Sequence, residues 1–168
     1  MRKVILDVGC GDDAKGDINV DLSLNTMQII RNQKKSIRTS VNIVADGNYL
    51  PFKNNSFDKV MSHHVIEHTK TPFKFLSELI RVSKNEVEIK CPHKLSRDAK
   101  TAYHVSFFNK TWFGKACEAL SPEIRYSVKV TLDMFKIGYL TFPFTRPDEI
   151  TVRIRMCGSY TRNYRQFK

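Results

Sequence analysis

The first third of the chain contains short apolar runs, each followed by a polar or glycine-rich turn. Runs of this length, bounded by turn residues, are typical of strands that lie inside a sheet. The four runs that we expect to form strands are residues 4–6, 18–20, 41–45 and 57–64. We expect the run at 41–45 to be a buried strand. Repeated strands with ligand-binding residue types at their ends predict an open α/β sheet.

The remaining two thirds of the chain alternate between helical and strand spacing. Apolar residues recur at helical spacing after Thr71 and Pro72 and again from Asn109 to about Leu120, which predicts two helices. The segments in which strand patterns are expected are residues 87–91, 126–134 and 150–156. The last two alternate with period two. The predicted fold is a Rossmann-like, mostly parallel seven-stranded sheet with a C-terminal antiparallel hairpin.

The length of 168 residues predicts one domain, which we place at residues 1–158, followed by a basic aromatic tail at 159–168. The apolar run at residues 4–6 is too short for a signal peptide, and no run approaches a membrane span. The four cysteines are scattered without a C-x-x-C pair, which favours reduced thiols. We therefore expect a cytoplasmic protein.

Gly9 and Gly11 follow the first expected strand, and Asp21 ends the second strand ten positions later. Glycine lets the backbone approach a ligand, and an acid at a strand tip can accept hydrogen bonds from both ribose hydroxyls. A dinucleotide site is disfavoured because the next glycine is Gly16, the acid comes about ten residues early, and the connection at 9–17 is too short for a crossover helix. The pattern favours S-adenosylmethionine, which has no phosphate to hold.

Further segments downstream complete a pattern that resembles a known family. The segments are Leu6 to Gly11, Asn19 to Ser23, Ala45-Asp46 with Leu50-Pro51-Phe52, Asn55 to Asp58, His64 to His68, and Glu78 to Val82. In this order and spacing the chain resembles a class I S-adenosylmethionine-dependent methyltransferase of the type 11 group. Two departures stand out: the helix usual between Gly11 and Asp21 is absent, and the link after Val82 is short. The expected fold is therefore a minimal one, which lacks the N-terminal helix and the first crossover helix.

The resemblance implies a set of cofactor-binding residues at the ends of the strands. Asp7, Gly9 and Gly11 are expected near the methionine part, Asp21 near the ribose, Asp46 and Gly47 near the adenine, and His63 on the sulfonium side. Cys10 and Leu22, which lie within these turns, complete the expected cofactor-binding set.

Histidines near the end of the fourth strand and in the loop after the fifth are the candidates for chemistry. His64 and His104 are predicted to face the methyl acceptor, because imidazole is a suitable base and ligands bind at strand tips. Glu67 and His68 recur in the type 11 pattern and are expected to orient the loop. His93 is a weaker candidate for the substrate site. No recognised metal-ligand spacing is present, so no metal site is predicted.

A net charge of +11 leaves the acceptor open. Basic residues cluster at 31–38 and near the end of the chain, interleaved there with aromatic residues, and the loop at 139–146 adds Phe142 and Phe144. Such stretches can bind RNA. The favoured acceptor is a small molecule, with RNA methylation or a non-catalytic partner subunit as alternatives. Because the expected fold lacks helices, a second copy or a partner subunit is expected to cover one side of the cofactor cleft.

Overall fold

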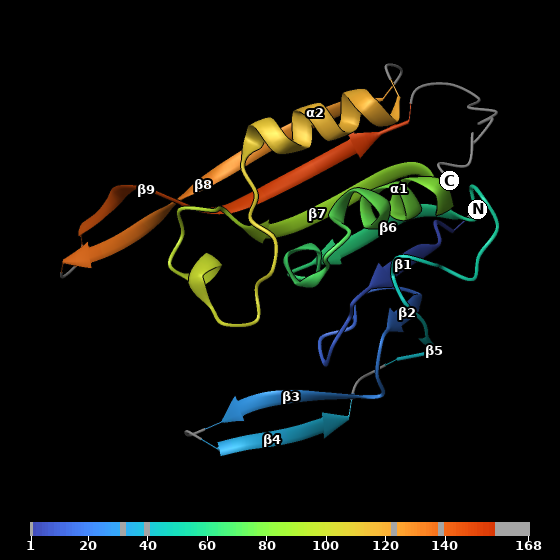
Figure 1. The fold of residues 1–168 in the computed structure, drawn as a ribbon, viewed down its shortest axis with the longest axis horizontal. Coiled ribbons are helices and arrows are strands. Elements are labelled where there is room, and N and C mark those ends of the chain that lie inside the picture. The colour runs from blue at the N-terminus through green and yellow to red at the C-terminus, as the bar shows by residue number, and fades with distance from the viewer. Residues whose placement is uncertain (1, 31–32, 39–40, 122–123, 138–139, 157–168) are drawn as a thin grey trace.

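The computed structural model describes residues 2–30, 33–38, 41–121, 124–137 and 140–156, and its main feature is a seven-stranded sheet (Figure 1). In sheet order the strands are β5 (Ile43–Val44), β2 (Ile18–Asp21), β1 (Ile5–Val8), β6 (Phe57–His63), β7 (Ser83–Pro92), β9 (Leu140–Arg155) and β8 (Arg125–Ile137). β9 runs opposite to the other six strands of this sheet, so it is antiparallel to both β7 and β8. The predicted sheet with its C-terminal antiparallel hairpin is confirmed.

The strand order reverses between β1 and β6, which are adjacent in the sheet although β2 and β5 lie between them in the chain. Such a switch point is where open α/β sheets bind ligands, beyond the carboxyl ends of the strands. The carboxyl end of β1 carries the glycine turn, and that of β6 carries His63. The topology therefore places the predicted cofactor turn and the histidine-rich turn side by side.

The connections around β2 differ from ordinary crossovers. Residues 9–17 form turns and contain no helix, as the short spacing predicts. The link from β2 to β5 holds a separate antiparallel hairpin, β3 (Asn25–Ile30) and β4 (Gln33–Arg38), which lies at one end of the molecule (Figure 1). The sequence pattern did not predict this hairpin. The expected buried strand at 41–45 is wrong, because β5 is a two-residue edge strand in which Val44 is 53% exposed.

Both α-helices, α1 (Pro72–Val82) and α2 (Lys110–Leu120), pack on the same face of the sheet. A Cβ at Gly47 would meet both the Phe75 ring of α1 and the Val8 side chain of β1. On α2, Glu118 accepts a hydrogen bond from Tyr126 of β8 at 3.1 Å, and Tyr126 is in register with buried Ile154. Two short 3₁₀ helices, η1 (Ile66–His68) and η2 (Asp98–Lys100), lie in the loops after β6 and β7.

The strands bury one face and leave the other polar. Leu6, Val60, Val87 and Ile154 are in register across four strands, and all are fully buried in the core. The neighbouring residues along these strands point to the opposite face and include Lys59, Glu86 and Arg155. Glu86 forms ion pairs with Lys59 at 3.5 Å and with Arg155 at 3.6 Å. The alternation expected at 150–156 is confirmed by this burial pattern.

Several expectations concern the last part of the chain. The loop expected at 139–146 is wrong, because β8 and β9 extend as a ribbon up to the pair Ile137 and Leu140. The tail at 159–168, Cys157 and part of the basic stretch at 31–38 lie outside the described residues.

Cys10, Cys91 and Cys117 are free thiols. Within the described ranges, no helix is long and apolar enough to cross a membrane.

Candidate functional site

The turn after β1 has a closed side and an open side. Gly9 (φ 75°) and Gly11 (φ 54°) both have the positive φ that glycine adopts without strain. A Cβ at Gly9 would lie 2.2 Å from a methyl group of Val65, so glycine allows the turns after β1 and β6 to touch. A Cβ at Gly11 would meet nothing within 4 Å. The backbone at Gly11 is therefore accessible to a ligand.

Asp21 at the end of β2 is joined to this turn. Its Oδ2 atom accepts a hydrogen bond from the Gly11 N–H at 2.9 Å, and its Oδ1 atom accepts one from the Leu22 N–H at 2.7 Å. A carboxylate offers about four lone-pair positions, so acceptor capacity remains for a hydroxyl. Leu22 is 72% exposed beside it. The structure thus brings together Gly11, Asp21 and Leu22 of the predicted cofactor set.

Asp7 and Cys10 are buried within the turn, and their expected contacts with the cofactor stay predictions. Asp7 is buried, and its Oδ2 atom accepts a hydrogen bond from the Lys15 N–H at 2.9 Å, which ties down the loop that replaces a crossover helix. Burial raises the pKa of Asp7, although the Lys15 N–H opposes the shift. Burial, followed by the charge of Asp21, raises the pKa of the Cys10 thiol to about 11. Both residues support the turn from beneath.

Asp46 and Gly47 follow the edge strand β5. Asp46 is exposed, and its Oδ1 atom accepts hydrogen bonds from the backbone and side-chain nitrogens of Asn48 at 2.8 and 2.9 Å. A Cβ at Gly47 would lie 2.4 Å from the Phe75 ring. Glycine is thus required for the turn to lie against α1, and the Asp46 carboxylate stays at the surface where an adenine amino group could reach it.

His63 lies on the polar face of the sheet. Its Nε2 atom is 3.2 Å from Glu88 Oε1, and burial lowers its pKa even though Glu88 favours the charged form. The predicted sulfonium-side contact therefore involves a residue that is already paired within the sheet.

His64 has a strained backbone at the switch point. It is a non-glycine residue with φ 57°, a conformation that costs energy and is common at functional sites. Its Nε2 atom lies 3.1 Å from Glu149 Oε2, and its Nδ1 atom lies 3.6 Å from Glu67 Oε1. The Glu67 carboxylate raises the pKa of His64 against the lowering effect of burial, and Glu149 adds to the increase.

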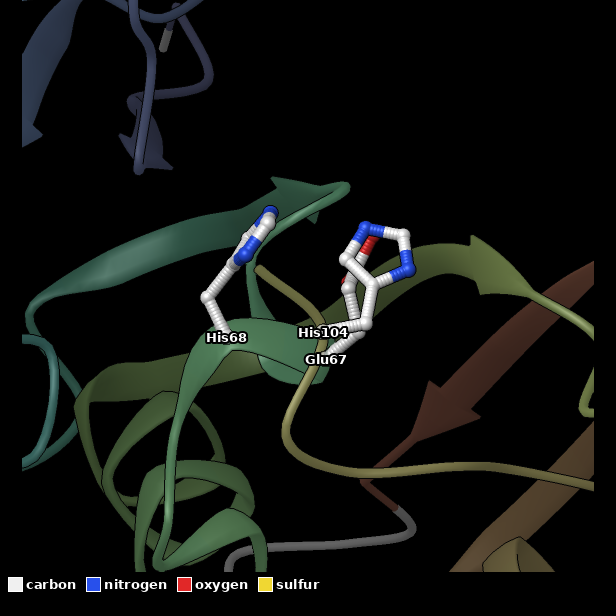
Figure 2. A group of neighbouring side chains, drawn as sticks. All are labelled: Glu67, His68 and His104. Atoms are coloured by element: carbon white, nitrogen blue, oxygen red, sulfur yellow. The ribbon is translucent and has the colours of Figure 1, made fainter. Parts of the chain in front are cut away.

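Glu67, His68 and His104 form a cluster (Figure 2), and its member Glu67 is the residue that lies 3.6 Å from His64. One ligand atom from each lies within 4.8 Å of the others, and the rings of His68 and His104 meet edge to face with 4.8 Å between centroids. The loop that carries His104 is attached to η1, because the Val105 and Ser106 N–H groups donate to the Glu67 carbonyl at 2.9 and 3.0 Å. Sequence reasoning expected Glu67 and His68 only to orient the loop. Their contact with His104 depends on a loop path that periodicity does not reveal.

His93 is tied into the local backbone. It is 8% exposed, its N–H donates to the Asp148 carbonyl at 2.7 Å, and its Nδ1 atom accepts a hydrogen bond from the Leu95 N–H at 3.2 Å. These contacts hold the start of the loop after β7. The structure therefore favours a local structural role over the substrate role considered from the sequence.

Comparison with known proteins identifies the family of the chain. A family model described as a methyltransferase domain, of type 11, matches residues 6–89, and the chain belongs to this family. A protein of Methanocaldococcus jannaschii without an assigned function is 36% identical over 90 residues. The match covers 49% of this chain and 37% of that protein, so the chain spans well under half the length of this relative.

Three solved structures with the same fold are described as methyltransferases. One from Thermotoga maritima, described as a possible histamine N-methyltransferase, has a TM-score of 0.63 and 14% identity over 94% of this chain and 84% of its own. One from Archaeoglobus fulgidus has a TM-score of 0.59 and 16% identity over 90% and 85%. A third belongs to the complex of a Haloferax volcanii methyltransferase with the Trm112 activator, with a TM-score of 0.58 and 14% identity over 94% and 84%.

Family and fold together imply S-adenosylmethionine as the cofactor, and the residues fit it. The space above Gly11 allows close approach of a ligand to the backbone, and Asp21 beside it can accept hydrogen bonds from ribose hydroxyls. Residues 9–17 contain no helix whose N-terminus could bind a phosphate, which suits a ligand without one. The cofactor predicted from the sequence is thus supported by the family and by the shape of the turn.

Proposed function

We propose that the protein transfers the methyl group of S-adenosylmethionine to a small-molecule acceptor. The observation that carries the proposal is the contact between Gly9 and Val65, which joins the open turn at Gly11 to the turn that bears His64 and Glu67. A cofactor held by the first turn and an acceptor held by the second would meet at the switch point between β1 and β6.

Methyl transfer needs little from the protein beyond alignment and control of one proton. The acceptor nitrogen or oxygen uses a lone pair to form the new bond to carbon. The bond from carbon to the sulfonium sulfur breaks, and the sulfur keeps that electron pair. Holding the two reactants in line supplies much of the acceleration. In this proposal His64 and His104 would face the acceptor, where an imidazole can orient the acceptor or take its proton.

Calorimetric titration with S-adenosylmethionine tests the cofactor half of the proposal. Asp21→Ala should weaken binding by about 1 to 3 kcal/mol, because hydrogen bonds to a charged group are lost. Asp21→Asn, which keeps an acceptor for the Gly11 N–H, separates loss of the ribose contact from collapse of the turn. Asp98→Ala, an exposed acid in η2, is the matched control and should bind as the original chain does. Equal affinity of folded Asp21→Ala would contradict the assignment.

RNA is the second candidate acceptor, and the polar face of the sheet favours it. On β6, β7, β8 and β9, cations outnumber acids among the described side chains of this face: Lys59, Lys90, Arg125, Lys129, Arg153 and Arg155 against Glu86, Glu88 and Glu149, whereas β1 and β2 add the acids Asp7 and Asp21. Replacing Lys129, Arg153 and Arg155 by glutamine should flatten the slope of log affinity against log salt by about 2, at roughly 0.7 per contact. The control replaces Lys70, Lys74 and Lys115, which lie around α1 and α2. RNA binding with no salt dependence, or an equal change in the control, would exclude this face.

The sequence also predicts that a second copy or a partner subunit covers one side of the cofactor cleft. The Haloferax volcanii structure described above contains a methyltransferase with an activator protein, and both α-helices of the described chain lie on one face of the sheet. A partner that covers the cofactor side would be consistent with both observations. Light scattering with and without S-adenosylmethionine measures whether the chain associates with itself.

A further inference from the structure

The cluster of Glu67, His68 and His104 has the composition of a metal site (Figure 2). We propose that these three residues bind a divalent first-row transition metal ion, with Zn²⁺ as the ion that suits them best. Two imidazoles and one carboxylate form a ligand set that leaves a coordination position open. The sequence predicts no metal because these residues have no recognised spacing; the proposal rests on their arrangement in space.

The buried carboxylate of Glu67 is the strongest single observation. The residue is 2% exposed, and neither of its carboxylate oxygens has a hydrogen-bond partner. The contact with His64 Nδ1, at 3.6 Å, is too long for a hydrogen bond. A buried carboxylate with only this long contact to His64 is costly, and buried charges in proteins are paired or coordinate metals. A cation at the cluster would give the Glu67 carboxylate a partner at bonding distance.

The two histidines are held in a way that leaves nitrogens available. His68 Nδ1 lies 3.1 Å from the Tyr103 carbonyl oxygen, so an N–H at Nδ1 donates to it and Nε2 keeps its lone pair. A second hydrogen bond of this type orients most metal-binding histidines. In Figure 2 the Nε2 atom of His104 lies on the side of Glu67, while Nδ1, which is buried without a hydrogen-bond partner, points away. The Nε2 atom of each ring is therefore the nitrogen offered to an ion.

The backbone fixes the distance between the two segments. The N–H groups of Val105 and Ser106 donate to the Glu67 carbonyl, so the residue that supplies the carboxylate also anchors the loop that supplies His104. The hydroxyl of Ser106 donates to the Thr69 carbonyl at 2.8 Å and adds a second anchor. A site built across two segments is thus preorganised by main-chain contacts.

The position of the site suggests what the ion does, and this step rests on the proposed function. The cluster follows Val65, which contacts Gly9 of the cofactor turn. An ion with an open position there could bind a hydroxyl or other heteroatom of the methyl acceptor and lower its pKa. The acceptor class would then be a small molecule with an oxygen or nitrogen able to ligate the metal. In this arrangement His104 holds the ion and does not act as the base.

The test uses chelator-treated full chain titrated with ZnCl₂ by calorimetry and with CoCl₂ by visible absorption. We expect one ion per chain and visible Co²⁺ bands of a low-coordinate site. His68→Ala and His104→Ala should each weaken binding by at least about 100-fold, since loss of an outer hydrogen bond alone costs 10- to 100-fold. Glu67→Gln keeps the shape of the side chain and should weaken binding similarly. Glu118→Gln, which removes an exposed carboxylate on α2 outside the cluster, should bind as the original chain does.

Two outcomes would overturn the proposal. One is that neither ion binds with a dissociation constant below about 1 mM, which corresponds to a binding free energy of about −4 kcal/mol. The other is that the three ligand variants bind the ions as tightly as the original chain does. If His104→Ala does not fold, as judged by circular dichroism, His104→Gln replaces it. S-adenosylmethionine affinity is measured on the same samples, because it depends on Asp21 and not on the cluster. Metal failure with intact cofactor binding rejects only the metal site, and cofactor failure with intact metal binding rejects only the proposed function.

Discussion

The two faces of the sheet are made by the same strands but follow opposite rules. On one face, Val87 and Ile154 are fully buried under two helices. On the other face, Glu86 and Arg155, next to them in the chain, form an ion pair at 3.6 Å. Mostly parallel sheets usually have helices on both faces and near-continuous apolar strands. Here charged side chains such as Glu86 and Arg155 alternate with apolar ones, so much of this face suits water or a charged partner.

The polar face satisfies its own charges across strands. Glu88 on β7 is the centre of this network, with Lys59 and Arg153 each at 3.1 Å and His63 at 3.2 Å. Opposite charges in cross-strand pairs stabilise a sheet modestly, whereas burial of apolar side chains supplies most of the stability. The comparison therefore predicts large effects from changes on the apolar face and smaller ones from changes on the polar face.

The largest effect is expected from Ile154→Ala on the apolar face. Ile154 is fully buried in the core, and truncation leaves a cavity between β9 and the helices. The free energy of unfolding should fall by about 3 kcal/mol. Urea denaturation followed by circular dichroism measures this loss. A change below about 1 kcal/mol would mean that the helical layer packs loosely on this strand.

The second largest effect is a loss of folding stability at acidic pH that depends on Glu88. Burial raises its pKa, but Lys59 and Arg153 outweigh burial and hold the pKa at about 2, below the ordinary 4.5. A carboxyl with a lowered folded pKa contributes stability that is complete above 4.5 and is lost as pH falls toward 2. Between pH 5 and pH 3 the original chain should lose about 2 kcal/mol more than Glu88→Gln, at about 1.4 kcal/mol for each unit of pH.

The control for this prediction is Glu118→Gln, which removes an exposed carboxyl on α2 that accepts a hydrogen bond from Tyr126. Its stability should follow the same pH dependence as the original chain. Parallel pH profiles for the original chain and Glu88→Gln would show that the ion pairs of the polar face are solvated and contribute little.

Regular patterns predicted the sheet well, whereas local loop geometry limited prediction of the site. The period-two alternation at 150–156 identified β9 and its wet face, and the spacing between Gly11 and Asp21 identified a turn without a helix. The hairpin of β3 and β4 was missed because its mainly polar sequence has no apolar face to set a period. Burial of 41–45 was overestimated because an apolar run does not reveal that its strand lies at the sheet edge.

The site shows the same limit at the level of single residues. Asp21 was assigned from its place at a strand end, and the structure joins it to Gly11. Asp7 was assigned from the resemblance to the family, and its carboxylate accepts a hydrogen bond from the Lys15 N–H, a contact that depends on a loop without periodicity. The contact between His68 and His104 brings together residues 36 positions apart, and only the path of the loop decides it.

The smallest effect is expected from Arg155→Ala, which is the sharpest test of whether the polar face is open. Arg155 is 74% exposed, and its partner Glu86 retains Lys59 at 3.5 Å. Exposed ion pairs contribute about 0 to 1 kcal/mol, so the free energy of unfolding should change by less than about 0.5 kcal/mol. The difference should vanish at about 1 M salt, where the Debye length is about 3 Å. A loss above about 2 kcal/mol that grows with protein concentration would instead show that a second copy covers this face, because burial makes an unpaired charge costly.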